Sequence, residues 1–262
     1  MNKDLLLSSE EYKNIGKHEV PYVYTISKNG KVLYYFGSSH SFDPLHPQFS
    51  KLKDFFNDFL KHSDPDKRVV FIEGGVPDKL RKNVEESIIS GGEMQYVDYL
   101  AKKEGVSVFS PEFAPRELSK ELMKRYPVDE VAYYFFVRTY MQYLRVQHNP
   151  DFDSYMNIFL LKNMDEAVVM PYLFPNSLIP QIHIRLFSKD FDLADKEFFS
   201  RIVNPNHKDT VINNISQSTS QLRDIHILEQ IEKEWEKGNS IFIIYGGTHA
   251  VMQEPALKSL LQ

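Results

Sequence analysis

The sequence predicts an α/β fold (α+β in the looser sense) with a central mixed β-sheet flanked by helices. Two short runs, at 68–72 and 241–245, are almost continuously apolar, which is typical of strands covered on both faces. Segments with apolar residues at helical spacing separate these runs along the chain. The chain has 262 residues, 42% of them hydrophobic and 26% charged, so it is long enough to bury the core of such a fold.

The first part of the sheet is predicted to be a β-hairpin. The runs 21–27 and 31–36 are rich in β-branched and aromatic residues, and Asn29 and Gly30 between them suit the positive φ angles of a type I′ turn. Apolar residues then recur at helical spacing over 49–62, and this spacing predicts a helix.

The strand at 68–72 is expected to lead into a helical segment. Helices are predicted over 78–90 and 93–104, with the glycine pair at 91–92 separating them. A further short strand is predicted over 106–109, where apolar residues follow a glycine.

From about 114 to 205 the sequence has mainly helical patterns, and 128–146 is the clearest helix among them. A long amphipathic helix at 216–237 follows, and the glycine directly after it is suited to a helix C-terminus. The strand at 241–245 comes next, and a last helix is predicted from about 250 to 261.

We therefore expect a single domain over 1–262. Its α/β core is built from 18–113 and 212–262, and the segment at about 114–205 is a helical insertion between these halves.

The composition excludes several classes of function. The chain has no cysteine, which excludes disulfides, thiolate zinc sites, iron–sulfur clusters and a cysteine nucleophile. It has a net charge of -5 and no basic cluster, so we expect no nucleic acid partner. No apolar run approaches the roughly 20 residues of a membrane helix, and no signal peptide is evident, so we expect a cytoplasmic protein that acts on a small-molecule or peptide substrate. Nothing in the sequence indicates an oligomeric state.

One motif occurs twice, each time directly after a predicted strand. Gly37–His40 reads Gly-Ser-Ser-His and Gly246–His249 reads Gly-Gly-Thr-His. With 11 glycines and 9 histidines in the chain, chance alone gives roughly 0.4 Gly-x-x-His matches. We expect each glycine to let the backbone turn sharply off the sheet. Each histidine is then expected at the carboxyl edge of the strands, where open α/β folds bind ligands.

Acidic residues end two other predicted strands. Glu73 directly follows 68–72, and Glu112 comes shortly after 106–109. Two imidazoles with one or two carboxylates make a plausible site for a divalent metal ion such as Mn, Co or Zn. Such a metal site can activate water for attack on a carbonyl, with one glutamate as a ligand and the other accepting the proton.

The paired motifs, with the strand-end Glu73 between them, resemble the TraB/PrgY–TIKI family. This family belongs to a wider group that includes erythromycin-esterase-like and ChaN-like proteins. The resemblance implies a mixed α/β fold with an internally duplicated core and a crevice at these strand ends. It also implies the activity of the TIKI-type members, which are divalent-metal-dependent proteases.

The same resemblance implies roles for individual residues. His40, His249 and Glu73 form the core of the site, with both histidines as metal ligands and Glu73 as a third ligand or general base. Arg223, in the pair Arg223-Asp224 before the last strand, is expected to stabilise the developing oxyanion. Glu112 is a further catalytic candidate.

These observations favour a metal-dependent hydrolase, peptidase- or esterase-like, that uses a metal-activated water. One alternative is a protein that binds haem or a small ligand in the same crevice without turnover. A second is an interaction protein whose catalytic site has decayed. The histidines that follow no predicted strand are expected to lie outside the site: His18, His62, His148, His183, His207 and His226.

Overall fold

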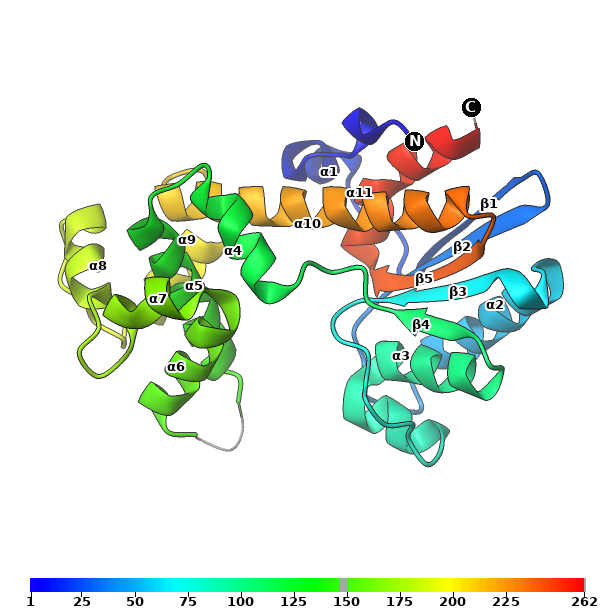
Figure 1. Ribbon diagram of the computed structural model, residues 1–262, viewed down its shortest axis with the longest axis horizontal. Helices are drawn as coiled ribbons and strands as arrows, with labels where there is room; N and C mark the ends of the chain where they lie inside the picture. The colour runs from blue at the N-terminus through cyan, green and yellow to red at the C-terminus, as the bar shows by residue number, and fades with distance from the viewer. Residues whose placement is uncertain (147–149, 262) are drawn as a thin grey trace. The chain divides into compact units, whose positions relative to one another are not determined.

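The computed structural model describes residues 1–146 and 150–261, so His148 lies outside the described residues. The described residues form an α/β fold with one five-stranded mixed sheet and helices on both of its faces (Figure 1), and this confirms the predicted fold class. The sheet order is β1-β2-β5-β3-β4. In chain order the strands are β1 (Tyr22–Lys28), β2 (Lys31–Ser38), β3 (Arg68–Ile72), β4 (Ser107–Phe109) and β5 (Ser240–Gly246).

The first two strands form the predicted hairpin. β1 and β2 pair antiparallel, and the register ends at the Lys28–Lys31 pair beside the turn. Asn29 and Gly30 have φ angles of 54° and 76°, the left-handed conformations that this turn type requires. β2, β5, β3 and β4 run parallel to one another, so their carboxyl ends meet at one edge of the sheet.

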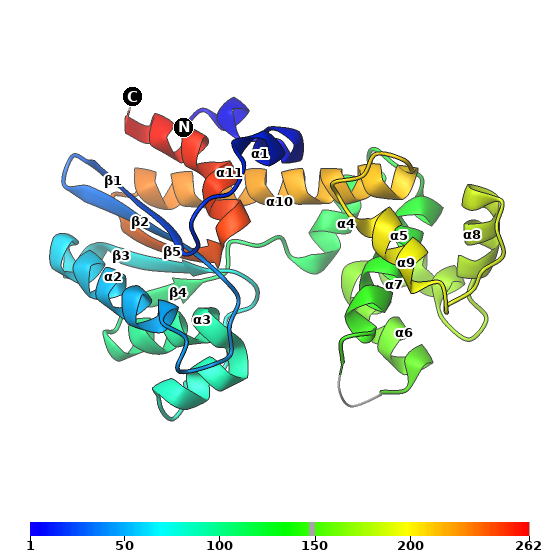
Figure 2. The ribbon, with the colours of Figure 1, turned by 180° about the vertical axis from the view of Figure 1, so that it is seen from behind.

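The second half of the long helix α10 (Val211–Glu236) and helix α11 (Gly247–Lys258) cover one face of the sheet (Figure 2). Leu228, Ile231 and Trp235 of α10 pack on strand residues such as Tyr35 and Ile243. All of these side chains are 5% exposed or less, so this face is sealed from water. The start of α10 at Val211 is five residues earlier than the sequence predicts.

Helices α2 (Gln48–His62) and α3 (Val84–Lys103) cover the opposite face. Aromatic side chains dominate this layer, and Phe56 meets Phe242 edge-on with ring centroids 5.1 Å apart. The prediction of a helix from residue 78 is wrong, because Asn83 caps α3 by accepting a hydrogen bond from the backbone N–H of Glu86.

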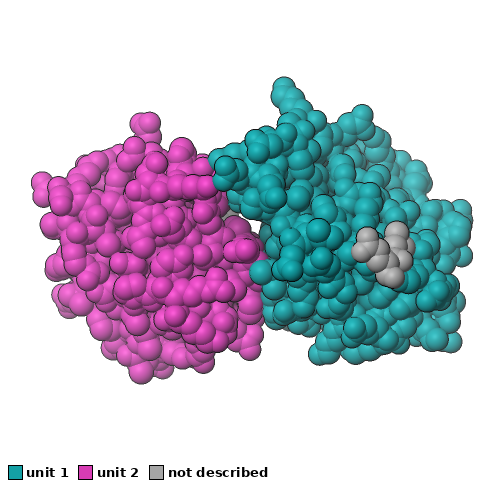
Figure 3. All heavy atoms as spheres, turned by 90° about the horizontal axis from the view of Figure 1, so that it is seen from above, with its two compact units in different colours: residues 1–112, 224–262 teal, residues 113–223 magenta. Residues whose placement is uncertain are grey.

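The chain divides into two compact units, coloured separately in Figure 3. The first contains the sheet and comprises residues 1–112 and 224–262. The second comprises residues 113–223 and is helical, and the predicted insertion at 114–205 falls within its range. Its helices are α4 (Pro115–Met123), α5 (Val128–Tyr143), α6 (Phe152–Asn163), α7 (Glu166–Val169), α8 (Ile179–Phe187), α9 (Lys196–Val203) and the first half of α10.

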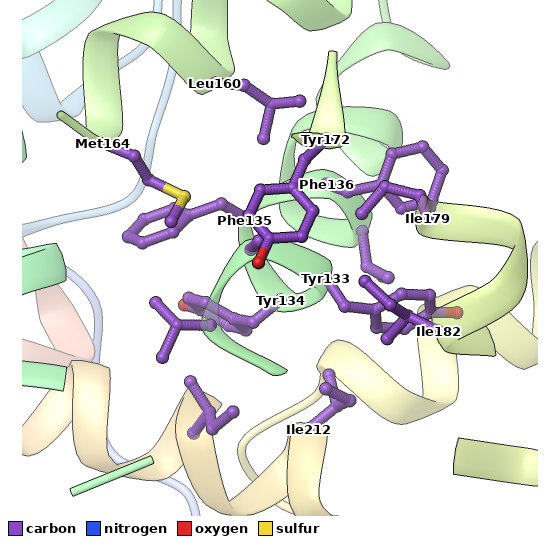
Figure 4. Packing of buried hydrophobic residues seen from close by; sticks show 14 of the residues in the cluster. Tyr133, Tyr134, Phe135, Phe136, Leu160, Met164, Tyr172, Ile179, Ile182 and Ile212 are labelled. Carbon is purple, nitrogen blue, oxygen red and sulfur yellow. The ribbon is translucent and has the colours of Figure 1, made fainter. Parts of the chain in front are cut away.

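The helix α5 is the centre of the second unit. Four consecutive residues, Tyr133 to Phe136, are each 3% exposed or less. Because successive positions of a helix point in different directions, burial of all four means that α5 is surrounded on every side. Figure 4 shows this packing, with Leu160, Met164 and Tyr172 contributed by the segments around α5.

The first unit begins with the short helix α1 (Ser9–Ile15), which has a capping box formed by Ser8 and Glu11. No helix in the described part of the chain is long and apolar enough to span a membrane.

Candidate functional site

The two Gly-x-x-His motifs and Glu73 come together at the carboxyl edge of the sheet. β2 and β3 flank β5, and the parallel register sets Ser38 opposite Gly246. His40 lies in the loop two residues after β2, and Glu73 directly follows β3. His249 lies in the first turn of α11, which begins directly after β5. The two histidines are therefore presented differently, one from a loop and one from a helix.

Gly246 lies at the centre of this arrangement. Its backbone N–H donates a hydrogen bond of 2.9 Å to Oε2 of Glu73, and Oε1 of Glu73 lies 3.9 Å from Nε2 of His249. A Cβ atom on Gly246 would be 3.4 Å from Nε2 of His40 and 3.7 Å from Oε2 of Glu73. The three predicted side chains thus meet around one backbone position that carries no side chain.

His40 is held by Glu93 of α3. Nδ1 of His40 lies 2.6 Å from Oε1 of Glu93, whose side chain is only 2% exposed although that of His40 is 63% exposed. The hydroxyl of Ser38 donates to the same oxygen at 2.9 Å, and the backbone N–H of Ser41 donates to Oε2 at 3.3 Å. Glu93 therefore fixes both the ring of His40 and the loop that carries it.

The electrostatics of this pair favour the ionised form of both partners. The hydrogen bond to Glu93 raises the pKa of His40 above its usual 6.5, against the opposing effect of partial burial, and the charge of Glu73 adds to the rise. Burial alone would raise the pKa of Glu93, but the hydrogen bonds from His40, Ser38 and Ser41 outweigh it and the pKa is lowered.

A break in α3 allows Glu93 to reach His40. Gly91 and Gly92 have non-helical backbone angles, as their predicted role as a helix separator requires, and Gly92 has a φ of 58°. A Cβ on Gly92 would lie 2.7 Å from the carbonyl oxygen of Ser41. The glycine thus allows the loop after β2 to approach α3 closely enough for the carboxylate to bind the ring.

His249 is held in the same way from the other face of the sheet. Its Nδ1 lies 2.7 Å from Oδ1 of Asp224 on α10, and the Asp224 side chain is 1% exposed. Gln253 Nε2 donates to the same oxygen at 2.6 Å, and the hydroxyl of Tyr35 donates to Oε1 of Gln253 at 3.0 Å. A buried chain of hydrogen bonds therefore runs from the sheet through Gln253 and Asp224 to the histidine.

The glycines of the two motifs have different physical roles, and the expectation that the glycine turns the chain off the sheet is wrong for Gly37, which lies inside β2. Neither Gly37 nor Gly246 has a positive φ. A Cβ on Gly37 would lie 2.6 Å from Cβ of Ala250 and 2.9 Å from the carbonyl oxygen of Tyr22, so Gly37 allows α11 to pack closely on β2. Gly246 instead leaves open the space between His40 and Glu73.

The catalytic roles expected for Glu112 and Arg223 stay predictions. Glu112 lines a separate cavity of about 270 Å³ with His226, and it accepts a hydrogen bond of 3.4 Å from the hydroxyl of Tyr245. The Tyr245 ring packs edge-on against His249, so this ring links Glu112 to the site. Arg223 directly precedes Asp224 on α10 and is the last residue of the second compact unit.

A pocket of about 560 Å³ opens beside His40. We call it the His40 pocket; residues of 12–20, 38–40 and 246–248 line it. His18, which the sequence predicts to lie outside the site, is one of these residues, and its Nε2 is 2.8 Å from the hydroxyl of Tyr12. Only the chain fold, not a motif, brings the N-terminal segment to this position.

Sequence reasoning also missed the two carboxylates that hold the histidines. Asp224 did carry a signal, because it stands in helical register with the buried Leu228, Ile231 and Trp235. An acid in the buried stripe of a helix requires a partner. Glu93 carried a weaker signal, its position directly after two glycines that interrupt a helix.

The donor set suits a divalent metal ion. Metal-binding histidines commonly donate their second N–H to a carboxylate, and both His40 and His249 have such a partner on Nδ1. In the present arrangement, however, no three His, Asp or Glu side chains among the described residues are grouped so that they could hold a metal ion. Two ligands of a tetrahedral zinc ion lie roughly 3.3 Å apart, so the 3.9 Å between His249 and Glu73 would have to shorten on binding.

Comparison of the chain with protein-family models, with curated proteins and with solved structures finds no match in any of the three.

Proposed function

We propose that the protein is a metal-dependent hydrolase of the TraB/PrgY–TIKI type that cleaves an amide or ester bond. Nε2 of His40, Nε2 of His249 and the carboxylate of Glu73 would hold a divalent ion, Mn, Co or Zn. The observation that carries this proposal is the matching support of the two histidines, each bonded through Nδ1 to a buried carboxylate.

Glu93 and Asp224 determine which ring nitrogen of each histidine carries the proton. A carboxylate accepts a hydrogen bond from Nδ1, so the proton of each neutral ring resides there and the lone pair of Nε2 points the other way. This is the form that ligates a metal ion. Because Glu93 and Asp224 are both buried, they hold the rings in fixed orientations before any ligand arrives.

Glu73 and Gly246 complete the proposed site. The backbone N–H of Gly246 fixes one oxygen of Glu73, and the other oxygen is the one nearest His249. A divalent ion bound there supplies Lewis-acid polarisation of the scissile carbonyl and lowers the pKa of a water molecule. The missing side chain at position 246 leaves space between His40 and Glu73 in which the reacting carbonyl can lie.

Metal analysis of the purified protein tests the proposal. The protein is incubated with Mn²⁺, Co²⁺ or Zn²⁺, freed of unbound metal, and analysed for bound metal beside His40→Ala and His249→Ala. We expect near-stoichiometric metal in the parent and a loss of most of it in each variant, because each variant removes one of three protein ligands. Hydrolysis of peptide and ester substrates, with and without a chelator, then tests turnover.

His207→Ala is the matched control. His207 is about half exposed and has a carboxylate partner, Asp209, 4.0 Å away, but it lies in the second unit. We expect this variant to keep the metal of the parent. Absence of metal from the parent, or equal metal in the parent and both site variants, overturns the proposal.

A further inference from the structure

The outer edge of β1 carries backbone groups that point away from the sheet. β1 is an outermost strand, and among the described strands only β2 pairs with it (Figure 1). The backbone N–H of Val32 donates to Oγ of Ser240, on the side of β5, so Val32 and its β1 partner Ser27 exchange no ladder hydrogen bonds. Because such pairs alternate along antiparallel strands, the N–H and C=O groups of Val23, Thr25 and Ser27 also point away from β2.

We call Val23, Thr25 and Ser27 the outward residues. Within the described part of the chain, their outward backbone groups have no hydrogen-bond partner. Proteins usually protect such an edge with a charge, a proline or a bulge. The register of β1 with β2 is continuous, so there is no bulge, and Pro21 and Lys28 lie only at the two ends of the strand. The outward side chains are uncharged and exposed, so this edge can accept another strand.

The outward residues are complementary to those of a second copy of the chain. In a two-fold antiparallel pairing centred on Thr25, Thr25 lies opposite itself and Val23 lies opposite Ser27 of the other copy. All outward residues then exchange both of their hydrogen bonds, about six in total. Moving the centre by one residue would place Ser27 opposite Pro21, which has no N–H, or Val23 opposite Asn29 of the turn. Only the register centred on Thr25 therefore uses the whole edge.

Charge complementarity in this register favours a second copy as the occupant. Lys28 would lie opposite Tyr22 of the other copy, in a pair without hydrogen bonds, where side chains are closest. The hydroxyl of Tyr22 donates to Oε2 of Glu254 at 2.6 Å, so Lys28 would lie beside the carboxylate of the other copy. Nζ of Lys28 donates to the carbonyl oxygen of Leu260 at 2.8 Å, and two of its three N–H groups stay available. The two-fold axis makes this ion pair occur twice.

We propose that the protein forms a two-fold dimer in which the β1 strands of two copies pair antiparallel and join their five-stranded sheets into one. The assembly is closed, because the pairing uses the β1 edge of both copies. The edges that stay open are the β4 strands, which are only three residues long. The dimer does not depend on the proposed function, so either can fail without the other.

Analytical ultracentrifugation of the full chain between about 1 and about 200 μM tests the dimer. We expect a concentration-dependent equilibrium of monomer and dimer without larger species. Thr25→Lys sets two like charges opposite each other at the two-fold axis and should weaken the dimer more than about tenfold. The side chain is exposed in the monomer, so the fold should be kept. Thr25→Val is the matched control, because it keeps a β-branched, uncharged side chain and should dimerise as the parent does.

A second pair of variants tests the charge complementarity. Lys28→Glu places a carboxylate opposite the Tyr22–Glu254 pair of the other copy and should weaken the dimer about tenfold. Lys53→Glu changes the net charge equally on an exposed residue of α2, and we expect it to leave the dimer unchanged. Equal effects of the two variants would overturn the assigned register.

Backbone amide hydrogen exchange shows whether β1 is the interface. The amides of the outward residues should exchange more slowly at the concentrations where the dimer forms. A parent that stays monomeric over the whole range overturns the inference. A dimer that Thr25→Lys leaves intact, or one that gives the outward amides no protection, also overturns it, because the interface is then elsewhere.

Discussion

Glu93 and Asp224 lie on opposite faces of the sheet, and each holds one histidine at its edge through Nδ1. Glu93 comes from α3, in the layer of α2, and Asp224 comes from α10, in the layer of α11. Both side chains are 2% exposed or less. Glu93 bonds to Ser38, His40 and Ser41, and Asp224 bonds to His249 and Gln253, so each carboxylate can be substituted without removing the partner of the other.

Glu93→Gln should lower metal affinity about 10- to 100-fold, the usual effect of removing a carboxylate that orients a metal-binding histidine. The amide has the shape of the carboxylate but no charge, so the orientation and basicity of His40 change while the packing stays. Titration of the metal-free protein with Zn²⁺ or Co²⁺ measures the effect.

Asp98→Asn is the control for this change. Asp98 also lies on α3, is also 2% exposed, and pairs with Lys102 at 2.9 Å instead of with a histidine. Its substitution should reduce stability and leave metal affinity within about twofold of the parent. Equal metal affinity in Glu93→Gln and Asp98→Asn would show that Glu93 has only a structural role.

Asp224→Asn should reverse the tautomer of His249. An amide at this position can present its N–H₂ group to Nδ1, which moves the ring proton to Nε2 on the side of Glu73. The lone pair needed for ligation is then lost from Nε2. Nitrogen NMR of the His249 ring reads the tautomer directly, and a proton that stays on Nδ1 would contradict this explanation.

Gly246→Ala should lose metal binding, whereas Gly37→Ala should lose stability. Alanine fits the backbone at Gly246, where φ is -57°. Its methyl group would be nearest to Nε2 of His40, at 3.4 Å, so stability should stay within about 1 kcal/mol. Its methyl group would lie between His40 and Glu73, and metal binding should fall.

Gly37→Ala places a Cβ 2.6 Å from Ala250 and should cost about 1–3 kcal/mol of unfolding free energy, as overpacking does. Denaturant unfolding and metal titration of both variants separate the two effects. Loss of stability in Gly246→Ala with unchanged metal affinity would refute the role given to its missing side chain.

His183 should make the stability of the second unit depend on pH. It is 1% exposed, and its Nε2 has no hydrogen-bond partner among the described residues. Burial, with a contribution from Lys189, lowers its pKa below the usual 6.5. The unfolded chain therefore takes up the proton first as the pH falls, so stability is full above about pH 6.5 and is lost as the pH drops towards the lowered folded value.

Thermal unfolding followed by circular dichroism between about pH 5 and about pH 8 measures this dependence. His183→Phe keeps a ring in the aromatic cluster and cannot be protonated, so its stability should vary less over this interval. The same slope in the parent and in the variant would assign the dependence to other groups.

The fold class could be predicted because its signals are local. The apolar runs at 68–72 and 241–245, the Asn29-Gly30 turn and the glycine pair at 91–92 each correspond to a feature of the structure. The first residues of the helices were predicted less accurately. Capping by Asn83 depends on hydrogen bonds that the spacing of apolar residues does not reveal.

The core of the candidate site was also accessible, because parallel strands bring their carboxyl ends to one edge. The pairing of Glu93 with His40 and of Asp224 with His249 could not be predicted, because β5 lies between β2 and β3 only in the folded chain. Which acid meets which histidine depends on that pairing and on the helices packed over it. The motif indicated where His249 would lie, but only the packing of α10 brings Asp224 to it.

The residues of 12–20 that line the His40 pocket lie in the chain before β1 and are not part of the sheet. These residues belong to α1 and to the segment after it, and Tyr12 of α1 contacts Thr248. His40 and His249 are instead held by buried carboxylates, and Glu73 is held by the backbone N–H of Gly246. Under the proposed function, the reactive groups and the N-terminal side of the pocket therefore come from separate pieces of the chain. Under the proposed function, exchange of residues 12–20 would change the pocket while His40, His249 and Glu73 keep their places, so this short segment is where selectivity would evolve.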